Sequence, residues 1–178
     1  MHKLSITVFV LLFSFFAAIG NNDEGSVIYQ NVQQRFKEEA PYQSALFNIE
    51  LAARLSESPK EVKEAVFLNV QKEELLNIHQ NSPNNLVVNI PAPNGNGTWA
   101  LQLCKTEILT NDFKIKTSSG LEISAPKATY YQGILNNDPH SMVALSIFEN
   151  EIIGMISNTF GNYDLGKIDI KQSELYVL

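Results

Sequence analysis

Cysteine is nearly absent from this 178-residue sequence, since Cys104 is the only one. A lone cysteine excludes an intramolecular disulfide, so the core has to be stable without a covalent cross-link. The chain is therefore not one of the small disulfide-rich scaffolds that are common among exported proteins. Internal repeats and low-complexity tracts are also absent, which excludes solenoid folds.

Positive charge is scarce as well. Lysine and arginine number 13 against 19 aspartate and glutamate residues, which gives a net charge of −6. A chain with this balance repels a phosphate backbone, so nucleic acid is not an expected partner. The composition is otherwise that of a globular protein, with 44% hydrophobic and 18% charged residues.

The amino terminus has the pattern of a cleavable signal peptide. His2 and Lys3 precede an almost unbroken apolar run over residues 4–18, and Ala18 and Gly20 are the small residues that signal peptidase accepts. We expect residues 1–20 to be removed on export and the protein to be secreted, with an uncleaved signal anchor as the alternative. The run is shorter than the about 20 residues that cross a bilayer, and no second run follows, so no stable membrane anchor is expected.

Recognisable catalytic motifs are missing. The three histidines are His2, His79 and His140, and none lies in an H-E-x-x-H helix that could hold zinc beside a general base. A G-x-S-x-G elbow, a phosphate-binding G-x-x-x-x-G-K loop and an acidic calcium loop are absent too. We therefore do not expect this chain to be an enzyme.

Two groups of residues have the chemistry of a catalytic site without its spacing. Asp138, His140 and Ser141 are the residue types of a hydrolase triad, but neighbours in one turn seldom converge as a triad requires. The sequence N-N-D-P at residues 136–139 favours a turn instead. Glu149 and Glu151 flank another turn and are better explained as solvated carboxylates than as an acid and base pair.

The pattern after residue 60 is typical of β-structure. Strands are predicted over residues 65–70, 86–90, 99–104, 113–116, 121–124, 128–133, 142–148 and 151–158, with a short helical turn at 72–79. The sequence P-N-G-N-G at residues 93–97 predicts a hairpin turn. In a eukaryotic secretory pathway Asn96 would also be a glycosylation acceptor. The expected fold is α+β, mainly antiparallel β as a sheet or sandwich, with one or two short helices.

The segment before residue 60 has a different pattern. Residues 21–34 are polar and predict a loosely ordered lead. Phe47, Leu51 and Leu55 recur at four-residue spacing, and Pro41 and Pro59 bracket them, which predicts a helix over residues 43–56. We therefore divide the chain into a signal peptide (1–20), a polar lead segment with a helix (21–60) and a β-rich domain (61–178).

The most distinctive stretch consists of Y-Y-Q-G at residues 130–133, D-P-H-S-M-V-A-L-S at residues 138–146 and I-I-G-M-I at residues 152–156. This order of a Tyr-x-Gly step, a polar turn, an S-x-V-A-L-S strand and a returning G-x-I strand resembles the propeptide of reprolysin-type (ADAM-like) secreted zinc metalloproteases. A looser likeness covers residues 66–170. The motif residues are Tyr131, Gly133, Ser141, Leu145, Ser146 and Gly154. At the two glycines we expect close packing or unusual backbone angles that exclude a side chain.

The resemblance implies a secreted prodomain that assists the folding of a zinc metalloprotease and keeps it latent as a zymogen. Its partner would be the protease catalytic domain, in cis or in trans, contacted by a strand or loop along the substrate groove. Zinc is expected in that missing domain, and no cofactor is expected in this chain.

The family commonly maintains latency through a propeptide cysteine whose thiolate occupies the open position on the catalytic zinc. That cysteine lies beyond the Tyr-x-Gly motif, whereas Cys104 precedes it and alternates with Trp99, Leu101 and Leu103. Cys104 is thus a weak candidate for an inhibitory zinc ligand, and a thiol in the core is the favoured interpretation.

The sequence departs from the family in its last residues. It ends at Leu178 without a protease domain, and its two arginines, Arg35 and Arg54, form no dibasic cleavage site. We expect a fragment of a longer precursor. The alternative is a stand-alone secreted binding module or protease inhibitor, and an enzyme with an unrecognised site ranks third.

Overall fold

The computed structural model describes residues 25–48, 65–93, 95, 97–168 and 175–178. In this part of the chain a ten-stranded sheet runs in the order β1-β4-β5-β8-β9-β10-β11-β12-β3-β2, and a separate two-stranded sheet pairs β6 with β7. Neighbouring strands are antiparallel except for β1 and β4. The strands are β1 (Tyr42–Ser44), β2 (Phe47–Asn48), β3 (Phe67–Val70), β4 (Asn85–Pro91), β5 (Thr98–Thr106), β6 (Ile115–Lys116), β7 (Glu122–Ile123), β8 (Ala128–Leu135), β9 (Met142–Phe148), β10 (Ile152–Asn158), β11 (Gly161–Lys167) and β12 (Leu175–Val177).

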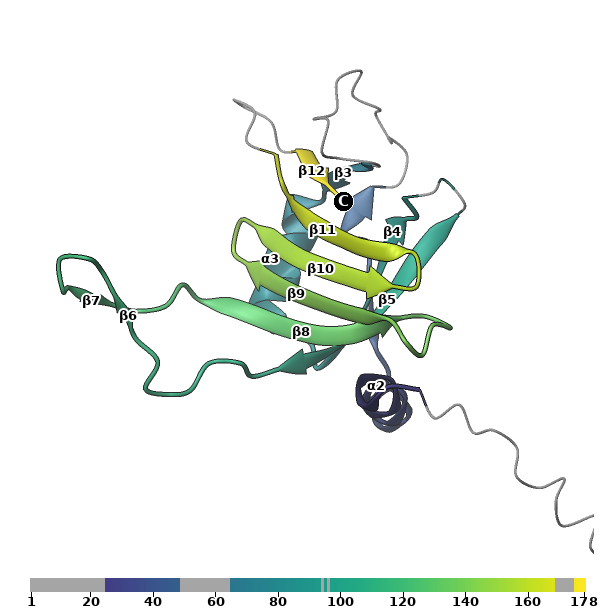
Figure 1. Ribbon diagram of the computed structural model, residues 1–178, viewed down its shortest axis with the longest axis horizontal. Coiled ribbons are helices and arrows are strands. Elements are labelled where there is room, and N and C mark those ends of the chain that lie inside the picture. The colour runs from purple at the N-terminus through teal and green to yellow at the C-terminus, as the bar shows by residue number, and fades with distance from the viewer. Residues whose placement is uncertain (1–24, 49–64, 94, 96, 169–174) are drawn as a thin grey trace, which may run out of the picture.

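The large sheet is strongly curled. Strand β2, at one end of the strand order, contacts β4, which is the neighbour of β1 at the other end. The two ends of the sheet therefore lie close together. Figure 1 shows the sheet curling around helix α3 (Lys72–Asn81), with helix α2 (Val27–Glu38) on the outside near β5 and β8. The predicted class of a mainly antiparallel β protein with two short helices is confirmed.

The main core lies between α3 and the concave face of the sheet. Leu75 and Ile78 of α3 are buried among side chains of the curled strands, such as Leu103 of β5 and Leu145 of β9. Burying each of these side chains stabilises the fold by about 1.5–3 kcal/mol. The short helix has a defined end because Ser82 adopts a φ of 44° and its backbone N–H donates to the Ile78 carbonyl.

The hairpin predicted around residues 93–97 is confirmed. Strand β4 pairs with β5 over its whole length, with Leu86 opposite Leu103 and Ile90 opposite Trp99. Gly95 and Gly97 have φ values of 73° and 89°, which other residues rarely adopt. The predicted strands that became β3 and β6 to β10 are also present, as is the predicted helical turn, which is α3.

The loosely ordered lead predicted for residues 21–34 is wrong where the structure describes it, because α2 begins at Val27. The Ser26 side chain accepts a hydrogen bond from the Tyr29 N–H and so caps the helix. At the other end, the Asn85 amide donates to the carbonyls of Arg35 and Glu39. The bonds from Asn85 of β4 connect the sheet to a helix in which only Val32 is buried, and a local sequence pattern does not reveal them.

The helix predicted over residues 43–56 is also wrong in its described part. Gln43 lies in β1, beside Val87 of β4, and Phe47 lies in β2, opposite Val70 of β3. Tertiary strand pairing has overridden a local helical periodicity here. Residues 42–48 are therefore joined to the sheet of the β-rich domain rather than separate from it. The remainder of the predicted helix, the signal peptide and Asn96 lie outside the described residues.

Candidate functional site

Three of the motif residues form one row across the centre of the sheet. Leu145 of β9 lies opposite Tyr131 of β8 on one side and opposite Gly154 of β10 on the other. Tyr131 and Leu145 are buried in the main core. The Tyr131 hydroxyl donates to the Pro83 carbonyl at 2.9 Å, and burial raises its pKa. The row is thus a packing unit that joins β8, β9 and β10.

Both motif glycines permit a close approach between strands, as expected. A Cβ atom at Gly133 would collide with the Gln102 carbonyl oxygen and would lie 2.9 Å from the Leu103 Cα, both in the backbone of β5. At Gly154 it would collide with the end of the Leu145 side chain. Neither glycine has a positive φ, so the requirement at both positions is space rather than backbone angle.

Ser141 organises the turn between β8 and β9. Its hydroxyl donates to the Asp138 carbonyl at 2.6 Å and accepts from the Leu135 N–H at 2.8 Å, and the residue is only 1% exposed. The Asp138 carboxylate accepts from the His140 backbone N–H at 3.1 Å. These bonds belong to a turn and occupy the groups that a hydrolase triad would need free. The last motif residue, Ser146, lies half-buried on β9 opposite Ile153.

Cys104 lies beneath α2 on the convex face of the sheet. It forms a second, smaller apolar cluster with Val32 of α2 and Ile134 of β8. Burial raises the pKa of its thiol, and the nearby Arg35 guanidinium lowers the pKa by a smaller amount. A buried, protonated thiol is a poor metal ligand, so the placement favours the core thiol over the zinc ligand.

Between β5 and β8 the chain leaves the sheet as a projecting segment, residues 107–127, which we call the arm. Figure 1 shows β6 and β7 at the end of the arm, well away from the curled sheet. A turn at Thr117 to Gly120 closes this hairpin, and Lys114 and Glu122 form an ion pair across it at 2.8 Å. The arm carries large apolar side chains that are between 44% and 63% exposed: Ile108, Phe113, Leu121 and Ile123.

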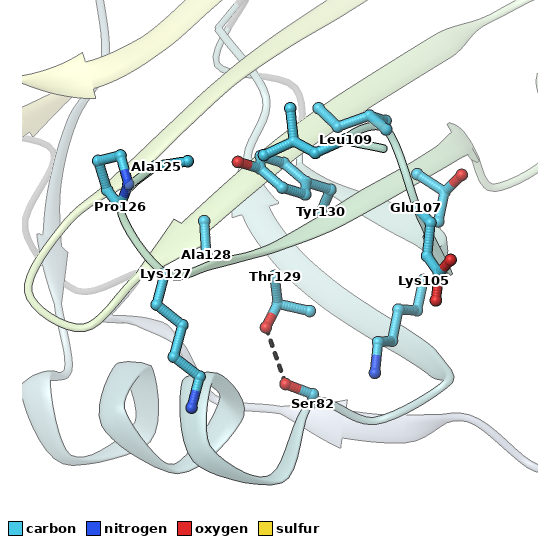
Figure 2. A pocket seen from close by; sticks show the side chains of 12 residues that line it. Ser82, Lys105, Glu107, Leu109, Ala125, Pro126, Lys127, Ala128, Thr129 and Tyr130 are labelled. Atoms are coloured by element: carbon cyan, nitrogen blue, oxygen red, sulfur yellow. Dashed lines mark hydrogen bonds between the residues drawn. The ribbon is translucent and has the colours of Figure 1, made fainter. Parts of the chain in front are cut away.

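A hollow with a volume of about 510 Å³ opens at the base of the arm, where β5 and β8 separate. We call it the fork and define it by residues 105–109, residues 125–130 and Ser82. The hydroxyls of Ser82 and Thr129 share a hydrogen bond of 2.8 Å at its inner end. Figure 2 shows the side chains of Lys105 and Lys127 on the two sides of this hydrogen bond.

The fork was not predicted from the sequence. Its two lysines are 22 positions apart and lie on separate segments, so no motif connects them. Only the end of the pairing between β5 and β8, at Thr106 and Tyr130, brings them together. A signal was nevertheless present, because residues 107–127 lack the long strand patterns on either side of them.

Within the described residues, no group of three or more histidine, cysteine, aspartate or glutamate side chains is arranged to hold a metal ion. The same part of the chain has no helix that is both long enough and apolar enough to cross a membrane. Comparison of the chain with protein-family models, with curated proteins and with solved structures finds no match in any of the three.

Proposed function

We propose that this chain is the secreted prodomain of a reprolysin-like zinc metalloprotease, which it helps to fold and keeps latent. The observation that carries the proposal is the row of Tyr131, Leu145 and Gly154 across β8, β9 and β10. Three of the six residues that resemble the family motif thus pack the central strands together, and Ser141 is buried in the turn that joins two of them. The resemblance therefore lies in the core of a folded domain rather than in scattered surface positions.

The arm supports a role in binding. Large apolar side chains on a projecting hairpin are exposed to water. Their burial against a partner is favourable because it removes apolar surface from water. The open edges of β6 and β7 can also accept a strand of a partner through backbone hydrogen bonds. A segment with both properties suits a prodomain that lies along the substrate groove of its protease. It equally suits a stand-alone inhibitor, which is the second candidate.

Refolding separates these two functions. A reprolysin-type protease domain from the same source is denatured and refolded with zinc, with and without the purified chain. Hydrolysis of a fluorogenic peptide is then measured before and after the chain is digested away. A prodomain raises the activity recovered after digestion and suppresses activity before it. Suppression without improved recovery identifies an inhibitor, and the absence of both effects refutes the proposal.

The position of Cys104 predicts how latency is maintained. Because α2 covers its thiol, we propose that inhibition depends on the arm and not on a thiolate bound to zinc. Cys104→Ala is therefore expected to inhibit as well as the original chain does. A loss of inhibition in this variant, with unfolding unchanged, would restore the zinc-ligand hypothesis.

A further inference from the structure

The fork has the features of a binding site that goes beyond the proposed function, since it does not depend on the partner being a protease. Its first feature is an exposed strand edge. The ladder between β5 and β8 ends at Thr106 and Tyr130, whereas β8 continues to Ala128 with β9 as its partner. At Ala128 and Thr129, the first two residues of β8, the side of the strand that faces the fork therefore has no strand paired to it among the described residues. Such an edge is a template for an added strand.

The second feature is the local charge. Lys105 and Lys127 line the fork, and Glu107 is the one acidic residue among its lining side chains. No ion pair of either lysine is found among the described residues. Arg35 adds positive charge nearby, since its guanidinium donates to the Lys105 carbonyl at 2.9 Å. Two lysines against one glutamate give the fork a net positive charge in a chain whose net charge is −6, which favours an acidic ligand.

The third feature is the shape and apolar surface of the fork. A volume of about 510 Å³ accommodates several side chains. Ile108 is 60% exposed, and Leu109 and Pro126 line the hollow beside it. A free inorganic anion would leave this apolar surface in water, whereas an extended peptide can cover it while its backbone bonds to the strand edge.

We propose that the fork binds an extended acidic segment of a partner protein, which adds to the free edge of β8 and places its carboxylates near Lys105 and Lys127. Each lysine contributes a charge-assisted contact, and the backbone pairing fixes the direction of the bound segment. Binding is expected to weaken with added salt, since exposed charges are screened within about 10 Å at 0.1 M ionic strength.

Fluorescence anisotropy of a dye-labelled peptide of alternating valine and glutamate tests the proposal on the purified protein. The control peptide has glutamine in place of glutamate. The test variant is Lys105→Gln with Lys127→Gln. The matched control, Lys114→Gln with Lys116→Gln, removes the same charge from the tip of the arm, where both lysines are exposed and paired with Glu122.

The glutamate peptide is expected to bind and the glutamine peptide to bind at least about tenfold more weakly, which corresponds to about 1.4 kcal/mol. The fork variant should lose about tenfold in affinity and the control variant less than about twofold. Equal losses in the two variants would mean nonspecific attraction and would overturn the proposal. Displacement of the peptide by inorganic phosphate at matched ionic strength would also overturn it, in favour of a small-anion site. Unfolding followed by Trp99 fluorescence verifies that each variant is folded.

Discussion

Replacing the glycines of the sheet by alanine should have three different effects on stability. At Gly133 the new methyl group meets the backbone of β5, with Gln102 C at 2.8 Å and Leu103 Cα at 2.9 Å, and backbone cannot move alone. At Gly154 it collides with the end of the Leu145 side chain, which can rotate, and lies 3.0 Å from the Ala144 carbonyl oxygen, which has to shift only slightly. At Gly166 of β11 nothing lies within 4 Å, which makes this position a matched control in the same sheet.

The magnitudes follow from these contacts. Gly133→Ala requires β5 and β8 to separate, which costs about 1–3 kcal/mol of overpacking strain, and each ladder hydrogen bond that breaks adds about 1 kcal/mol. We expect a total loss of about 3 kcal/mol or more in the free energy of unfolding. Gly154→Ala should cost about 1–2 kcal/mol, because Leu145 must leave a preferred rotamer. Gly166→Ala should be neutral or stabilising by about 0.4–1 kcal/mol, because alanine restricts the unfolded chain.

Urea unfolding gives the required differences. Trp99 is the only tryptophan, and its ring lies 5.0 Å from that of Tyr163 in an edge-to-face arrangement, so its fluorescence reports the loss of tertiary structure. The predicted order of stability is Gly166→Ala, then Gly154→Ala, then Gly133→Ala. If the free energies of unfolding of Gly133→Ala and Gly166→Ala differed by less than about 0.5 kcal/mol, the close approach of β5 and β8 would be refuted.

Three further predictions concern α2, the core hydroxyl and the arm. Asn85→Ala removes two hydrogen bonds to the carboxyl end of α2. Cys104, beneath that helix, should then react with a thiol reagent at least about tenfold faster. An unchanged rate would show that other contacts hold α2 in place. Burial raises the pKa of Tyr131 above its ordinary 10.0, so its contribution to stability is complete below pH 10 and is lost at higher pH. Tyr131→Phe should therefore lower the free energy of unfolding by about 1 kcal/mol at pH 7, and its urea midpoint should fall less steeply at alkaline pH than that of the original protein. Equally steep falls in the two proteins would contradict this. Phe113→Ser on the arm should weaken protease inhibition at least about tenfold without changing the urea midpoint, whereas the control Ile153→Ser, similarly exposed on β10, should leave inhibition intact.

The sequence predicted those parts of the fold whose signals are local. The alternation of Leu86, Val88 and Ile90, followed by a glycine-rich turn, was enough to identify the β4–β5 hairpin. Strand β11 was missed because residues 161–167 contain Gly161, Gly166 and polar residues, and its pairing with β10 rather than its composition makes it a strand.

The errors before residue 60 have the same origin. Helix α2 depends on a cap at Ser26 and on Asn85, which is distant in sequence. Phe47 has helical spacing with later leucines but lies opposite Val70 in a strand. The fork was also beyond prediction, because Lys105 and Lys127 line one hollow only where the pairing between β5 and β8 ends. Local patterns cannot encode pairings between distant segments.

The curl of the sheet has a functional consequence. It places the motif residues Tyr131 and Leu145 in the main core, with Gly154 half-buried beside Leu145, so these residues are not available to a partner. Figure 1 shows the arm outside the curled sheet. Exposed groups that a partner can contact include the apolar side chains of the arm and the lysines of the fork. Variants of the interior test the fold, and variants of the arm and fork test binding.

The nucleotide sequence of the source DNA beyond codon 178 tests the central proposal most directly. If the chain is a prodomain in cis, we expect an in-frame continuation that encodes a protease domain with H-E-x-x-H-x-x-G-x-x-H, the motif that binds the catalytic zinc. A stop codon directly after Leu178, together with a secreted product whose mass matches a chain ending there, would contradict a prodomain in cis.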